Sequence, residues 1–250
     1  ALTLRTPADA QAIRRGVPSG ARVLVVGGGF IGVEVAASLA SLGAAVTVVE
    51  MAAALWGGSL GETISSWAVG VLRDAGLSVR LGERLTTVEA VDAEMVVAGV
   101  GVTPRVQLAE AAGLDVDDGI VADVGHATSA AGIFAAGDVA RVAGRRVEHW
   151  HAAREGGEAA ALAMLGQPTP RARAPWVYSE FAGHLLDVVG WAPTFDEAVE
   201  LDGARLIAYL QGAEVAQLAI IDSVISVEDA RAFVERGGPL AELRLMQRHV

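Results

Sequence analysis

A glycine-rich turn between a predicted strand and a predicted helix is the sequence feature that most constrains the fold. Residues 21–26 form a short apolar run rich in valine, which is typical of a buried parallel strand. Apolar side chains then recur at helical spacing over residues 31–42, and Gly43 is suited to end that helix. Between them, residues 27–32 read Gly-Gly-Gly-Phe-Ile-Gly, a Gly-x-Gly-x-x-Gly motif in the strand-to-helix context that it requires.

Each position of this turn has a physical reason in a dinucleotide site. Gly27 permits the tight turn, and Gly29 lets a pyrophosphate approach the first amides of the helix, which include those of Phe30 and Ile31. Gly32 lets the helix and the strand lie close together. A plain glycine-rich turn is the alternative interpretation.

Glu50 ends the next predicted strand, residues 46–50, and lies about 20 residues beyond the turn. A carboxylate at that place binds the adenosine ribose hydroxyls of a dinucleotide and repels a 2′-phosphate. Met51 supplies no positive charge to offset that repulsion. We therefore expect a site for NAD(H) rather than NADP(H).

The expected fold class is α/β with a Rossmann-like parallel sheet, because predicted strands and helices alternate along the first hundred residues. A helical pattern over residues 60–75 is followed by strand patterns over 77–81 and 95–100. Together with the elements around the turn, they predict an NAD-binding domain over residues 1–105.

Two further segments follow this domain. Residues 106–167 are expected to form a partial second α/β domain, with a strand at 120–122 and an alanine-rich helix at about 151–165. Prolines 168, 170 and 175 indicate a linker at the start of residues 168–250, for which we expect a small α+β domain. Its predicted elements are strands at 185–190, 204–210 and 215–221, a hairpin turn at Gln211 and Gly212, and a helix that Ser226 begins and that runs through Arg236.

The composition narrows the classes of function. The 250 residues include no cysteine, which excludes disulfides, thiolate metal sites, iron–sulfur ligation and a redox-active dithiol, and we nominate no metal ligand. A formal net charge of −11 argues against nucleic acid as the main partner. No apolar run approaches the roughly 18 residues of a membrane span, and the first residues lack a signal-peptide pattern. We therefore expect a cytoplasmic enzyme that does not interact with membranes.

Several short motifs occur in an order that resembles one family. They are Leu-Arg-Thr at residues 4–6, the glycine turn with Glu34 after it, Gly-Val-Gly-Val-Thr-Pro at 99–104, Ala-Ala-Gly-Asp ending at Asp138, Glu-His-Trp at 148–150, and Pro-Trp-Val-Tyr-Ser-Glu at 175–180. In order and spacing, over essentially its whole length, the chain resembles the FAD-dependent NADH:ferredoxin reductases of oxygenase systems. This is the group of the putidaredoxin and biphenyl-dioxygenase reductases, within the pyridine nucleotide-disulfide oxidoreductase superfamily.

The resemblance implies roles for individual residues. On the flavin side, it implies that Arg5 contacts the flavin cofactor, that Asp138 binds the ribityl chain with the Val139 amide near the phosphate, and that Trp150 lies beside the ring system. On the nicotinamide side, it implies that Gly99 and Gly101 leave room for the nicotinamide half of NAD and that Glu34 positions the carboxamide. From the residues alone, other readings stay open: Asp138 as a helix N-cap, Trp150 as core packing and Glu34 as a solvated helix residue.

The activity that the resemblance implies is electron transfer from NADH through FAD to a [2Fe–2S] ferredoxin of an oxygenase system. In such a reaction the cofactor carries the chemistry, so we nominate no conventional catalytic side chain. One alternative is a truncated or non-catalytic NAD-binding module. Another is a different flavin reductase of the superfamily, such as a nitrite-reductase flavin subunit or an apoptosis-inducing-factor-like protein. The oligomeric state stays open.

The sequence departs from the family in two places. The family carries a second Gly-x-Gly-x-x-Gly motif, in an N-terminal segment that binds the ADP half of FAD, and these 250 residues have only the copy at 27–32. We therefore expect the N-terminal FAD segment to be missing, so that residues 106–167 are only its returning part. The family also has a further β-hairpin where this sequence runs directly through Val91 and Asp92, which predicts an omission there.

The acidic chain also contains a local group of arginines, which is relevant to docking an acidic ferredoxin. Two readings are open for this group, a basic patch or a set of solvated surface residues. Its members are Arg141, Arg145, Arg146, Arg171 and Arg173.

Overall fold

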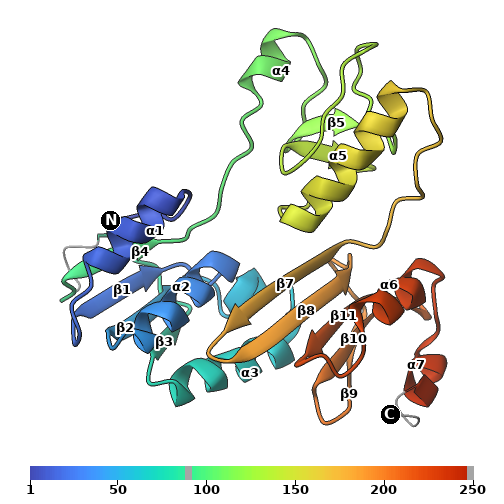
Figure 1. The fold of residues 1–250 in the computed structure, drawn as a ribbon. Coiled ribbons are helices and arrows are strands. Elements are labelled where there is room, and N and C mark those ends of the chain that lie inside the picture. The colour runs from blue at the N-terminus through green and yellow to red at the C-terminus, as the bar shows by residue number, and fades with distance from the viewer. Residues whose placement is uncertain (88–91, 247–250) are drawn as a thin grey trace.

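A four-stranded parallel sheet forms the first part of the computed structural model, which describes residues 1–87 and 92–246 (Figure 1). Its strands are β1 (Arg22–Val26), β2 (Ala45–Glu50), β3 (Ser78–Leu81) and β4 (Met95–Ala98), in the order β3-β2-β1-β4. This confirms the predicted Rossmann-like sheet. The predicted omission at Val91 and Asp92 cannot be compared with the structure, because Val91 lies outside the described residues.

The helices predicted over residues 31–42 and 60–75 are both present in this part, and a further helix precedes the sheet. Helix α1 (Pro7–Arg15) starts at a capping box in which Thr6 and Asp9 bond each other's backbone amides. Helix α2 (Phe30–Ser41) follows the glycine turn, and α3 (Gly61–Asp74) leads into β3. A short 3₁₀ element, η1 (Leu55–Gly58), lies between β2 and α3.

The second segment is a small module that Figure 1 shows above the rest, joined by two extended connections. It contains α4 (Gln107–Ala111), β5 (Ile120–Ala122), β6 (Ala140–Val142) and α5 (Trp150–Met164), with β5 and β6 parallel. Its buried core is a cluster of three alanines, which is small for an independent unit. Asp138 lies in the turn before β6, so the helix N-cap reading of this residue is wrong.

The C-terminal part is a five-stranded antiparallel sheet in the order β7-β8-β11-β10-β9. Its strands are β7 (Trp176–Phe181), β8 (His184–Gly190), β9 (Glu197–Leu201), β10 (Leu206–Gln211) and β11 (Glu214–Ile221), followed by α6 (Val227–Glu235) and α7 (Leu240–Met246). Strands β8, β10 and β11 confirm the predictions, as does α6 with Ser226 as its N-cap. The sequence reading missed β7, β9, β6 and α7.

The C-terminal sheet and the parallel sheet share one hydrophobic core. This core joins Val23 and Val48 of the parallel sheet to Phe181, Val188 and Tyr209 of the antiparallel sheet. The buried Tyr209 hydroxyl donates to the Leu60 carbonyl at 2.5 Å, across the boundary between the two parts. The opposite face of the antiparallel sheet is covered by α6, through a second cluster that includes Phe233. No helix among the described residues is long and apolar enough to cross a membrane.

Candidate functional site

Two of the turn glycines are required by the fold itself. Gly27 has a φ of 104°, in the region that favours glycine. A Cβ atom added to Gly27 would collide with the Gly99 carbonyl, and one added to Gly32 would collide with the Gly27 carbonyl, each at less than 3.0 Å. The turn, the start of α2 and the end of β4 are thus in van der Waals contact through bare backbone.

Gly29 faces open space, and this separates it from the other glycines of the motif. It has an ordinary φ of −78°, and an added Cβ would meet nothing within 4 Å. The helical hydrogen bonds of α2 begin with Val33 N–H, which donates to the Gly29 carbonyl. The N–H groups of Gly29, Phe30 and Ile31 donate to no acceptor among residues 1–87 and 92–246. An open surface with uncommitted amides at a helix N-terminus suits a pyrophosphate.

Glu50 lies beside this open surface at the end of β2. Its Oε2 accepts from Gly28 N–H at 2.6 Å, and its Oε1 accepts from Ala52 N–H at 2.7 Å. Each carboxylate oxygen has a second lone pair that can accept a hydroxyl proton. Glu50 therefore braces the glycine turn, a role that sequence reasoning did not anticipate. Its remaining lone pairs still suit the ribose hydroxyls that the sequence predicts.

The two glycines after β4 differ from each other. Gly99 N–H donates to the Val26 carbonyl at 2.8 Å, and an added Cβ would lie 3.2 Å from Gly32 N, so close chain contact already explains this glycine. Gly101 has a φ of 95°, and an added Cβ there would meet nothing within 4 Å. Of the two, Gly101 borders open space.

Glu34 projects from α2 toward the C-terminal sheet. Its Oε1 accepts a 2.6 Å hydrogen bond from the hydroxyl of Ser179 in β7, so the reading of Glu34 as a solvated residue does not hold. Burial raises the pKa of Glu34 above its ordinary value; the Ser179 bond opposes the rise and the nearby Glu180 adds to it. Sequence reasoning missed Ser179, whose only signal was its place in the motif at residues 175–180.

Three residues of the predicted flavin side meet at one pocket. Arg5, Asp138 and Val139 line a pocket of about 740 Å³ between the start of the chain and the second module. Within the part of the chain that the structure describes, Arg5 forms no ion pair and the Val139 N–H donates to no acceptor. Exposed apolar side chains such as Leu108 complete the lining. An uncommitted cation, a free amide and an apolar wall fit part of a flavin dinucleotide.

Trp150 is not a core residue, because 55% of it is exposed. Its Nε1 donates to the Tyr178 hydroxyl at 3.3 Å, and its ring lies against His151, whose ring in turn lies 4.1 Å from that of Trp176. Within this cluster, the Trp176 Nε1 donates to Asp187 at 2.8 Å. Burial raises the pKa of Asp187 and lowers that of His149, the N-cap of α5. The cluster joins the second module to β7 and includes two tryptophans, of which sequence reasoning nominated one.

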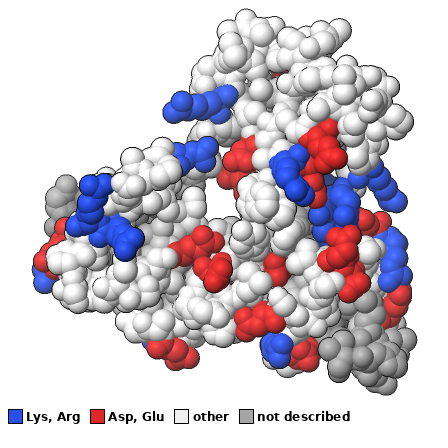
Figure 2. Space-filling model, viewed as in Figure 1, with Lys and Arg blue, Asp and Glu red and all other residues white. Residues whose placement is uncertain are grey.

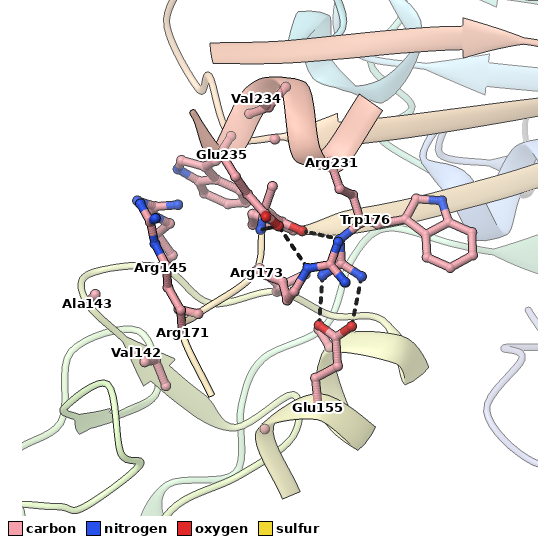
Figure 3. A pocket seen from close by; sticks show the side chains of 18 of the residues that line it. Val142, Ala143, Arg145, Glu155, Arg171, Arg173, Trp176, Arg231, Val234 and Glu235 are labelled. Carbon is pink, nitrogen blue, oxygen red and sulfur yellow. Dashed lines mark hydrogen bonds and ion pairs between the residues drawn. The ribbon is translucent and has the colours of Figure 1, made fainter. Parts of the chain in front are cut away.

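A second pocket, of about 710 Å³, lies between the second module and α6 (Figure 3). The buried Arg231 of α6 forms a two-bond ion pair with Glu155 of α5 at 2.8 and 2.9 Å, and its Nε donates to the Ala174 carbonyl. This pair ties the module to the C-terminal sheet. Figure 2 shows basic and acidic side chains side by side in this part of the surface.

The arginines that the sequence groups together are mostly neutralised. Arg141 pairs with Asp117, Arg146 pairs with Asp118 and Glu148, and Arg173 pairs with Glu228 and Glu235. Arg145 and Arg171 have no ion pair with any described residue. The group is therefore not a continuous basic patch. Among the described residues, no three histidine, aspartate or glutamate side chains are placed to hold a metal ion.

The chain is similar to a family of oxidoreductases and to several curated reductase components. The model of the family described as pyridine nucleotide-disulphide oxidoreductase matches residues 1–157. The anthranilate 1,2-dioxygenase system ferredoxin–NAD(+) reductase component of Burkholderia cepacia is 39% identical, over 75% of this chain and 51% of that protein. The chlorobenzene dioxygenase ferredoxin reductase component of Cupriavidus sp. (strain PS12) is 34% identical, over 98% of this chain and 65% of that protein.

The fold of this chain is similar to that of solved reductases. A crystal structure of a covalent putidaredoxin reductase–putidaredoxin complex matches with a TM-score of 0.89 and 28% identity, over 97% of this chain and 65% of that one. The chain spans about half to two thirds of the length of these relatives. The match over residues 1–157 places this chain in the pyridine nucleotide-disulphide oxidoreductase family.

Proposed function

We propose that this chain is the NADH-binding and electron-delivering part of an FAD-dependent NADH:ferredoxin reductase. The observation that carries the proposal is the site at the start of α2. There the amides of Gly29, Phe30 and Ile31 donate to no described acceptor, Gly29 borders open space, and the Glu50 carboxylate accepts from the adjacent Gly28. That arrangement binds a pyrophosphate and a ribose, and its negative charge disfavours a 2′-phosphate.

The flavin side rests on the pocket lined by Arg5, Asp138 and Val139. The Arg5 guanidinium would neutralise a phosphate, the Val139 amide would donate to it, and Asp138 would accept from ribityl hydroxyls. A bound flavin accepts a hydride from NADH and releases electrons singly. These 250 residues contain a single Gly-x-Gly-x-x-Gly motif, so flavin binding by this chain rests on the pocket at Arg5, Asp138 and Val139.

The electron acceptor that we propose is a [2Fe–2S] ferredoxin of an oxygenase system. Two relatives are themselves named as ferredoxin reductase components of dioxygenase systems, and a similar structure is a reductase bound to putidaredoxin. We also retain the division into residues 1–105, 106–167 and 168–250, since each range holds one of the three sheets. A cytoplasmic location stays a prediction.

A spectroscopic titration tests this proposal. The purified chain is mixed with FAD, separated from free flavin, and treated anaerobically with NADH and then with a [2Fe–2S] ferredoxin. We expect NADH to bleach the visible absorbance of retained flavin and the ferredoxin to restore it. An Arg5→Ala variant should retain less flavin, while its NADH affinity in the absence of flavin stays that of the original chain.

The outcomes of this titration separate the alternatives. A chain that binds NADH but retains no flavin would be an NAD-binding module. Flavin reduction without electron transfer to ferredoxins, but with transfer to quinones or to a nitrite-reducing partner, would indicate another flavin reductase of the family. A chain that binds neither cofactor would refute the proposal.

A further inference from the structure

One hydrogen bond joins the proposed nicotinamide side of the site to the C-terminal sheet. We propose that Ser179 is a positioning residue, whose hydroxyl holds the Glu34 carboxylate in place for the carboxamide of NADH. The inference rests on the proposed function, since it assumes that Glu34 faces bound dinucleotide. It assigns the antiparallel sheet a part in NADH binding, although that sheet supplies no residue to the glycine turn.

Ser179 has one proton to donate, and that proton is committed to Glu34. The residue is fully buried in β7, with a relative exposure of 0%, and is paired with Leu186 across the sheet. Its hydroxyl donates to Glu34 Oε1 at 2.6 Å, a length typical of a bond to an ionised acceptor. A buried hydroxyl with one donated bond has little freedom to turn.

Glu34 is a half-buried acid without a cationic partner in the described part of the chain. The cost of burying its charge raises its pKa, and Ser179 supplies the one hydrogen bond that offsets this cost among residues 1–87 and 92–246. Its Oε2 accepts no hydrogen bond from these residues. An oxygen left free beside one that is held in place suits the N–H₂ of a carboxamide.

The strand that carries Ser179 is itself held against the NAD-binding part. Phe181, two residues further along β7, lies 6.2 Å from Trp56 and 5.5 Å from Trp67 between ring centroids. Trp56 in turn contacts Phe30, the first residue of α2. These rings fix β7 relative to α2, so the distance between Ser179 and Glu34 is set by the core and not by a mobile loop.

Two ligands separate a positioning role from a purely structural one. NADH and ADP-ribose share the adenosine and pyrophosphate, and ADP-ribose lacks the nicotinamide. We expect Ser179→Ala to weaken NADH binding about three- to tenfold and to leave ADP-ribose binding within about twofold, because one hydrogen bond to Glu34 is lost. Binding is followed by fluorescence titration in the absence of FAD, so that NADH is not oxidised, and thermal melting monitors folding.

Two controls make the result specific. In a Glu34→Gln background, Ser179→Ala should add less than about twofold to the NADH dissociation constant, because both changes act on one interaction. Ser65→Ala removes another buried serine, which accepts from Leu55 N–H near the glycine turn. Any effect of Ser65→Ala should fall equally on both ligands, whereas Ser179→Thr, which keeps the hydroxyl, should restore NADH selectivity over ADP-ribose.

The failures can be told apart. If the original chain does not bind ADP-ribose, the proposed dinucleotide site is wrong. If it binds ADP-ribose and Ser179→Ala leaves NADH affinity unchanged, or weakens both ligands equally, the positioning role is overturned and the dinucleotide site stands. Additive effects of Ser179→Ala and Glu34→Gln would also overturn it.

Discussion

Single alanine substitutions in the glycine turn should separate folding from binding. At Gly27, alanine meets both a φ of 104° and the Gly99 carbonyl at a distance below any real Cβ contact. At Gly29, alanine meets an ordinary φ of −78° and no atom within 4 Å. We therefore expect Gly27→Ala to destabilise the protein and Gly29→Ala to weaken NADH binding with little loss of stability.

The magnitudes follow from these two environments. For Gly27→Ala, backbone strain costs about 1–3 kcal/mol and the forced shift of a close-packed neighbour a similar amount, which gives about 2–6 kcal/mol in all. For Gly29→Ala, the change of N-cap residue costs less than about 1 kcal/mol. Its methyl group would occupy space over the amides of α2, and we expect NADH affinity to fall at least about tenfold, since a pyrophosphate needs that approach.

Urea denaturation and NADH titration measure the two effects. With a denaturant slope of about 2–3 kcal/mol per molar, Gly27→Ala should lower the urea midpoint by about 1–3 M, and Gly29→Ala by less than about 0.5 M. A Gly29→Ala protein that binds NADH normally, or equal midpoints for the two variants, would contradict these expectations.

Three more expectations concern charged residues. Glu50→Gln should raise NADPH affinity relative to NADH by about tenfold in paired titrations, because the carboxylate that repels a 2′-phosphate is gone; an unchanged ratio would contradict this role. Arg231→Met should lower the free energy of unfolding, measured by urea denaturation, by about 2 kcal/mol. This loss is smaller than that expected for a fully buried ion pair, because the Glu155 side chain is 34% exposed. Arg236→Met breaks an equally short but exposed pair and should cost much less, so equal losses would show that burial is irrelevant. Glu34→Gln should stabilise the protein at neutral pH, because the buried carboxylate is ionised there at a cost in free energy. This stabilisation should shrink as the pH falls through the raised pKa of Glu34. A stabilisation that grows in acid would contradict this expectation.

The strands that sequence reasoning missed have a common cause. Strand β9 is an edge strand, and its first residue, Glu197, is exposed, so no apolar alternation marks it. Strand β7 follows Pro175 and mixes three aromatic residues with Ser179 and Glu180, so its composition lacks the aliphatic runs of the other strands. Each of the two pairs only with the next strand along the chain, β7 with β8 and β9 with β10, so both lie at edges of the sheet, where a partly exposed strand carries a weak apolar pattern.

Sequence alone determined the glycine turn, its strand and helix, and Glu50, because a tight turn and the residue ending the next strand are set by local spacing. Only the tertiary structure decided what those residues contact. It placed Glu34 against Ser179, 145 residues away, and put Arg5 and Asp138 in the lining of one pocket. Such pairs form when separate sheets come together over a shared core, and their geometry depends on side-chain interdigitation that no periodicity in the sequence records.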